Sequence, residues 1–137
     1  MSDGEGVLAL LAEGRRREKA QTLFYRKLAA DAERVLDPAA SERLNELHAD
    51  EQHHLSRLTA RLLELGGRPD DLRDVAVPAC ELLGWEAAAR ERERDEVSWY
   101  EDALGHTLDG ATREVLQEIV ESERRHHAEL RGKWMSA

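Results

Sequence analysis

Two short segments of the sequence each combine a glutamate with a pair of adjacent histidines. The first is ADEQHHL, residues 49–55, and the second is SERRHHAEL, residues 122–130. In both segments one histidine follows the glutamate by three residues, so a carboxylate and an imidazole share one face of a helix, one turn apart. Such a pair is either part of a charged surface or half of a metal site.

Spacing distinguishes the two histidines of each segment. His53 follows its glutamate by two residues and falls on the far side of the helix, whereas His54 shares the face of the glutamate. In the second segment His126 (i+3) and His127 (i+4) both satisfy the spacing. The i+4 position of the first segment is Leu55, which has no ligand atom. If the segments are copies of one another, His126 is the ligand and His127 is not.

Two further segments show the same kind of repetition. EKAQTLFYRKL (18–28) and ERDEVSWYEDAL (93–104) each begin with a glutamate and place a tyrosine seven residues later, as Glu18–Tyr25 and Glu93–Tyr100. The separation from Glu18 to Glu51 is 33 residues, close to the 30 residues that separate Glu93 from the glutamate of the second histidine segment. The sequence therefore predicts an internal duplication of a helical hairpin.

The elements that carry these segments are predicted to be four helices, at about 6–36, 39–65, 79–108 and 111–134, the third with a break at Gly84. Pro38 ends the first helix, Ser41 is the predicted N-cap of the second, and a Gly-Gly pair ends it. The first and third joins are short and predict antiparallel hairpins. The middle join, GGRPDDLRDVAVP (66–78), is long enough to cross over the bundle. We expect one all-α domain over residues 1–137, a ferritin-like four-helix bundle.

Each predicted helix places a glutamate near the middle of its apolar stripe: Glu18, Glu51, Glu93 and Glu123. A lone acid there is readily explained by a rim position or an ion pair with an arginine. Agreement among four helices favours a site, because unpaired carboxylates in a core cost several kcal/mol each or become protonated. One glutamate from each of two helices, with Glu-x-x-His from the other two, is the pattern of di-iron and di-manganese bundles.

Composition excludes several other classes of site. The net charge of -9 disfavours a nucleic-acid binder that relies on a basic surface. The single cysteine, Cys80, excludes a disulfide within the chain and any site built from several cysteines. The start has no basic secretory signal, and no apolar run approaches the length of a membrane span. We therefore expect a cytoplasmic protein that binds neither nucleic acid nor membrane.

Taken together, these motifs resemble those of the rubrerythrin family over nearly the whole chain. The resemblance implies a site for two iron ions, with manganese as an alternative. It implies seven metal ligands, Glu18, Glu51, His54, Glu93, Glu96, Glu123 and His126. It also implies that Tyr25 and Tyr100 hydrogen-bond to metal-binding carboxylates; the alternative is that both tyrosines only pack in the core.

Glu96 is the most specific residue of the resemblance, since it lies one turn after Glu93. The family pattern implies that Glu96 binds one iron in the oxidised state and that His54 replaces it on reduction, so these two residues are the expected catalytic ones. The position in the first helix that corresponds to Glu96 is Gln21, so the extra ligand occurs in one half only. The alternative is that Glu96 is a surface acid within the charged run RERERDE (90–96).

The resemblance implies reduction of hydrogen peroxide. Full-length rubrerythrins carry a four-cysteine rubredoxin domain that this chain lacks, so an external donor such as a rubredoxin or a flavoprotein is expected. One alternative is a ferritin-like ferroxidase or iron-storage protein that uses dioxygen or peroxide. Another is a metal-free helical interaction module. A homodimer is expected by analogy with small ferritin-like bundles, domain-swapped hairpins are a further option, and the sequence assigns no role to Cys80 or His48.

Overall fold

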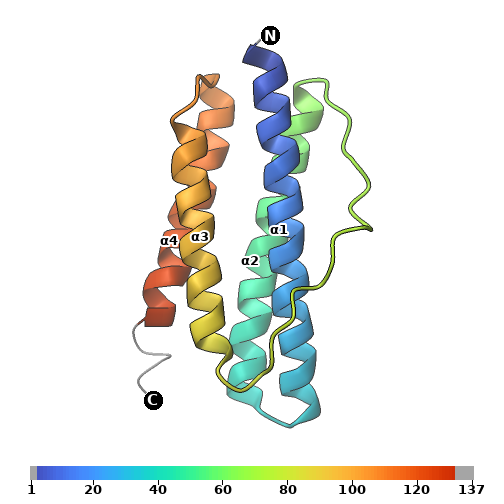
Figure 1. Cartoon of the computed structure of the whole chain (residues 1–137), viewed down its shortest axis with the longest axis vertical. Helices are drawn as coiled ribbons and strands as arrows, with labels where there is room; N and C mark the ends of the chain where they lie inside the picture. Colours follow the sequence, from blue (N-terminus) through green and yellow to red (C-terminus); the bar gives the residue numbers. More distant parts are fainter. Residues whose placement is uncertain (1–2, 132–137) are drawn as a thin grey trace. The chain divides into compact units, whose positions relative to one another are not determined.

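The computed structural model describes residues 3–131, and these residues form four helices (Figure 1). The helices are α1 (Asp3–Arg34), α2 (Pro38–Glu64), α3 (Trp85–Leu104) and α4 (Gly110–Arg131). No strand occurs between residues 3 and 131. The prediction of an all-α fold is confirmed.

The chain divides into two compact units, each built on an antiparallel pair of helices (Figure 1). Leu11–Leu83 form one unit, with most of α1, all of α2 and the long connection that follows α2. The other unit contains α3, α4 and the described residues before Leu11. Both predicted hairpins are present. A single domain over residues 1–137 stays a prediction.

The α1–α2 hairpin buries apolar side chains at helical spacing from both helices. On α1 these include Leu11, Phe24, Tyr25, Leu28 and Ala32, and on α2 Leu44, Leu47, Leu58 and Leu62. Steps of three and four residues keep each set on one face of its helix. Polar contacts add to the link between the helices, since Nε of Arg15 donates a hydrogen bond to Oγ1 of Thr59 over 2.8 Å.

The connection from α2 to α3 runs back along α1 in the same direction as the helix (Figure 1). Nη1 of Arg15 donates to the carbonyl of Asp70 over 3.2 Å, and Arg16 forms an ion pair with Asp74 at 3.0 Å. Further along, Nζ of Lys27 donates to the carbonyl of Cys80 over 3.4 Å. The order of these contacts shows that the connection runs beside α1 from Arg15 to Lys27.

Several helix ends differ from the predicted ones. The third helix begins at Trp85 rather than near residue 79, because Gly84 has a left-handed backbone (φ 78°) that interrupts a helix. It also ends at Leu104 rather than residue 108. The first helix ends at Arg34 rather than residue 36, since Leu36 has a φ of 60°. The predicted end of the fourth helix at residue 134 lies outside the described residues.

The prediction that Ser41 caps the second helix is wrong. Asp37 is the N-cap, and its Oδ1 accepts a hydrogen bond from the backbone N–H of Ala40 over 3.1 Å. Pro38 occupies the first helical position, where its missing N–H leaves no intrahelical bond unmade. Ser41 instead lies within the first turn of the helix, where its carbonyl accepts from Nδ2 of Asn45.

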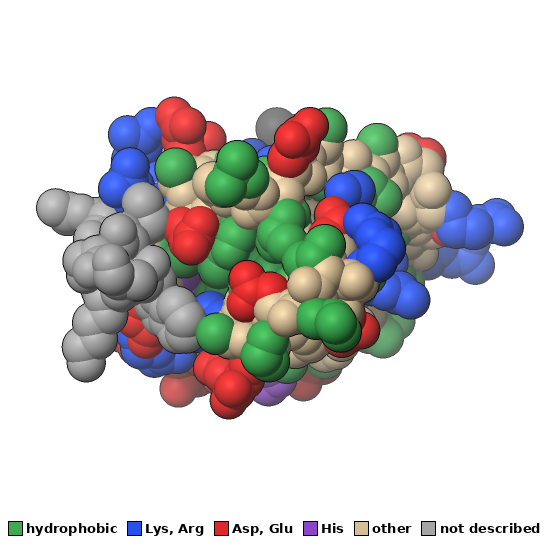
Figure 2. All heavy atoms as spheres, turned by 90° about the horizontal axis from the view of Figure 1, so that it is seen from below, with side chains coloured by type: hydrophobic (Ala, Val, Ile, Leu, Met, Phe, Trp, Pro, Cys, Tyr) green, Lys and Arg blue, Asp and Glu red, His purple; other side chains and the backbone are tan. Residues whose placement is uncertain are grey.

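The surface is heavily charged. Figure 2 shows acidic and basic side chains interspersed on one face, with apolar side chains among them. Between residues 3 and 131 no helix is both long enough and apolar enough to cross a membrane.

The Asp37 cap gives a first prediction. Replacing Asp37 with Ala removes the acceptor for the Ala40 N–H and should lower the free energy of unfolding by about 1 kcal/mol, measured by urea denaturation. Asp37→Asn keeps a side-chain oxygen at the cap and should stay close to wild type. Equal stability of the Ala and Asn variants would show that the cap contributes nothing.

Candidate metal centre

The unit formed by Leu11–Leu83 brings together Glu18, Glu51 and His54, which we call the first half-site. Nδ1 of His54 lies 3.0 Å from Oε1 of Glu51 and 3.4 Å from Oε1 of Glu18. One ligand atom from each residue lies within 4.8 Å of the others. All three side chains are buried. Two carboxylates on different helices therefore converge on one imidazole.

The unit that contains α3 and α4 repeats this arrangement with Glu93, Glu123 and His126, the second half-site. Nδ1 of His126 lies 3.1 Å from Oε1 of Glu123 and 3.4 Å from Oε1 of Glu93. Again one ligand atom from each residue lies within 4.8 Å of the others, and all three side chains are buried. Two hairpins of different sequence thus form the same constellation with nearly the same distances, as the predicted duplication requires.

The histidines chosen by spacing are the ones that face the carboxylates. His54 and His126 are 3% and 2% exposed, whereas His53 is exposed and His127 is half-buried. The structure places His126 beside Glu123. His126 was favoured over His127 because the residue that corresponds to His127 in the first segment is Leu55, which has no ligand atom.

In each hairpin the residue three positions after the glutamate that has no histidine partner on its own helix, Glu18 or Glu93, is also buried. Glu96 is 5% exposed, so the alternative that it is a surface acid is wrong. Gln21 has no exposed surface, and its Nε2 donates a hydrogen bond to Oε2 of Glu51 over 3.2 Å. The sequence identified Gln21 as the counterpart of Glu96, but it gave no signal of the bond to Glu51.

The two tyrosines repeat as well. Tyr25 packs edge-on against Phe24, with ring centroids 5.1 Å apart, and Tyr100 packs edge-on against Trp99 at 4.9 Å. Both tyrosines are fully buried. Their hydrogen bonds to metal-binding carboxylates stay a prediction. His48, for which no role was assigned, is half-buried on α2.

Electrostatics place a proton at the first half-site. Burial by itself would lower the pKa of His54, but the Glu18 and Glu51 carboxylates beside its Nδ1 outweigh burial and raise the pKa to about 10. At neutral pH the imidazole is therefore a cation between two carboxylates. An imidazolium carries a proton on both ring nitrogens, so Nδ1, which faces both acids, is protonated at the position where a metal ion would bind.

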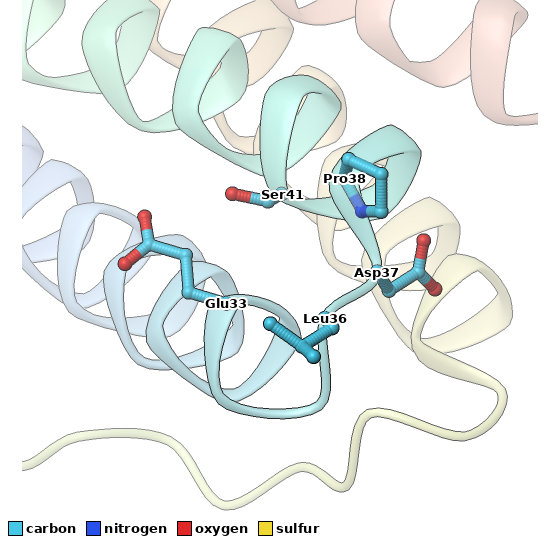
Figure 3. Close-up of a pocket in the computed structure, with 5 residues that line it drawn as sticks. All are labelled: Glu33, Leu36, Asp37, Pro38 and Ser41. Atoms are coloured by element: carbon cyan, nitrogen blue, oxygen red, sulfur yellow. The ribbon is translucent and has the colours of Figure 1, made fainter.

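The donor atoms fit iron or manganese. Each half-site supplies carboxylate oxygens and one imidazole nitrogen, the ligand types that suit these metals, and no thiolate. Cys80 lies on the connection after α2, where its thiol contacts the carbonyl of Glu81. A surface hollow at the α1–α2 turn (Figure 3) is lined by Glu33, Leu36, Asp37, Pro38 and Ser41 and contains none of the predicted ligands.

Comparison with known proteins finds similarity to a solved structure. No family model and no curated protein matches the chain. Among solved structures, the chain is similar to the bacterioferritin-related protein of Bacteroides fragilis, described as a dodecameric thioferritin. The TM-score is 0.81 at 18% identity, over 93% of this chain and 83% of that one. The chain therefore has the ferritin-like four-helix fold, as predicted. Membership of the rubrerythrin family stays a prediction.

The proton on His54 gives a second prediction. Metal binding requires a neutral imidazole, so adding Mn(II) to the metal-free protein at pH 7 should release this proton. His54→Gln should release about one proton fewer per chain than wild type, measured with a pH indicator in weak buffer. His53→Gln, an exposed neighbour, is the control and should match wild type. Equal release by all three proteins would contradict the assignment. The apparent affinity for Mn(II) should rise with pH across the neutral range.

Proposed function

We propose that this chain is a ferritin-like iron protein that binds Fe(II) and oxidises it with dioxygen or hydrogen peroxide. The observation that carries the proposal is the buried Glu–Glu–His constellation, formed twice with matching distances. Acids on a solvated surface are not expected to repeat with matching distances. Carboxylates buried in an apolar core cost free energy unless they are paired or bind a metal.

We further propose that the two half-sites act together and hold two ions. One half-site alone offers two carboxylates and one imidazole, which leaves a six-coordinate metal ion short of ligands. In ferritin-like di-iron bundles, two helices each contribute one glutamate and two contribute Glu-x-x-His, all pointing inward. Glu18 and Glu93 match the first kind, and Glu51–His54 and Glu123–His126 match the second. Glu96 would be the seventh ligand.

The charges support this arrangement. The five glutamates carry -5 when ionised, and two ions bring +4 as Fe(II) or +6 as Fe(III), so the ligands nearly balance the metal in both states. Each bound Fe(II) supplies one electron to the oxidant. The carboxylates hold the ions and compensate the charge gained on oxidation, and His54 must lose its proton before it can bind. As a further ligand, Glu96 would add a negative charge and would favour Fe(III).

Peroxide reduction is the second candidate function, and the burial of Glu96 favours it, because the resemblance to rubrerythrins assigns that residue a redox-dependent role. Two bound Fe(II) ions would supply the two electrons that convert one hydrogen peroxide and two protons into two water molecules. In this case the iron stays bound, and an external donor such as a rubredoxin or a flavoprotein must reduce it again. The donor and a homodimer are both proposals.

A third prediction separates these functions. The Fe(II)-loaded protein is mixed by stopped flow with dioxygen and, separately, with peroxide. In both cases the rate of oxidation should be well above that of free Fe(II). Comparable rates followed by release of Fe(III) support the ferroxidase. A much faster reaction with peroxide, with two irons retained per chain, supports the peroxidase. Glu123→Gln should slow oxidation at least tenfold, since it removes a ligand charge, while the exposed Glu121→Gln should not. Equal rates in these two variants would contradict both functions.

Metal removal gives a fourth prediction. A ligand that binds only the folded protein stabilises it by about 2.7 kcal/mol at a concentration one hundred times Kd. Saturating Mn(II) should therefore raise the melting temperature by about 5–10 °C over the metal-free protein, measured by calorimetry. Metal analysis should find two ions per chain. An unchanged melting temperature together with far fewer ions would instead favour the metal-free interaction module.

A further inference from the structure

Gln21 gives the two oxygens of one carboxylate different surroundings. An ionised carboxylate only accepts hydrogen bonds, so the amide NH₂ of Gln21 must be the group that faces Oε2 of Glu51, 3.2 Å away. The other oxygen, Oε1, lies 3.0 Å from Nδ1 of His54. The carboxylate therefore presents one oxygen to the metal-binding nitrogen of the first half-site while the second is held by an amide.

The matching position in the other hairpin carries an acid instead of a neutral amide donor. Glu96 follows Glu93 by three residues, as Gln21 follows Glu18, and it is also buried. An ionised glutamate there cannot donate a hydrogen bond, and it brings a negative charge. The half-sites are alike in geometry, but the second hairpin has a buried carboxylate at the position where the first hairpin has an amide.

We propose that Gln21 is a positioning residue that directs Oε1 of Glu51 to the metal and, because it is neutral, makes the first half-site the weaker of the two for divalent cations. The inference rests on the proposed function, since it presupposes that the half-sites bind metal. A donor that holds one oxygen restricts rotation of the carboxylate, and groups that orient ligands in this way typically change metal affinity 10–100-fold. The missing charge weakens the attraction for a dication.

The test is a Co(II) titration of the metal-free protein, followed by the visible absorption of the bound ion. Wild type should bind two ions in two distinguishable phases. Gln21→Met keeps the volume but loses the amide, so it should weaken the weaker phase about tenfold and shift its absorption band, with the tighter phase unchanged. Gln52→Met is the matched control, because Gln52 is an exposed glutamine next to Glu51, and it should leave both phases unaltered.

Reciprocal exchanges test the charge. Gln21→Glu places a carboxylate where the other hairpin has one, and it should tighten the weaker phase until the two phases approach each other. It should also lower the melting temperature of the metal-free protein, because it sets a second carboxylate against Glu51 without a cation between them. Glu96→Gln should weaken the tighter phase instead.

Two results would overturn the inference while leaving the proposed function intact. One is a Gln21→Met protein whose two phases and absorption bands equal those of wild type. The other is an equal weakening of both phases with a lower melting temperature of the metal-free protein, which would make Gln21 a packing residue only. A wild-type protein that binds no Co(II), Mn(II) or Fe(II) would overturn the inference and the proposed function together.

Discussion

Burial of negative charge is the constraint on which this molecule depends. Glu18, Glu51, Glu93 and Glu123 have no exposed surface, and a carboxylate in such a place must be protonated, paired with a cation or bound to a metal. The His54 imidazolium neutralises part of this charge when no metal is bound. The helices hold each of these glutamates at least eight residues from either end of its helix.

The repetition of the hairpin shows what determines the distances between the carboxylates and the imidazole in each half-site. The Nδ1–Oε1 distances agree within 0.1 Å between the half-sites, 3.0 and 3.4 Å in one against 3.1 and 3.4 Å in the other, although the surrounding residues differ. Helical spacing and the packing of one helix against its neighbour therefore position the ligands more than any local feature does. Two of the differences occur at matching positions, Gln21 against Glu96 and Phe24 against Trp99.

The sequence predicted the features that depend on periodicity. A three-residue step selected His54 over His53, and the duplication selected His126 over His127, because both arguments use only the helical repeat. The sequence missed the features that depend on local backbone geometry or on distance in space. Asp37 rather than Ser41 caps α2, and the left-handed Gly84 delays the start of α3. The bond from Gln21 to Glu51 joins residues 30 positions apart, so no local pattern reveals it.

The connection after α2 has more chain than its path requires. From the contact at Asp70 to the contact at Cys80 the chain takes ten residue-to-residue steps, enough to span about 33 Å when extended. The matching stretch of α1, from Arg15 to Lys27, rises only about 18 Å. This slack means that the segment is not under tension and does not set the spacing of the ligands. Since changes in loop length cost little free energy, it is the part of the chain where insertions and deletions disturb the carboxylates least.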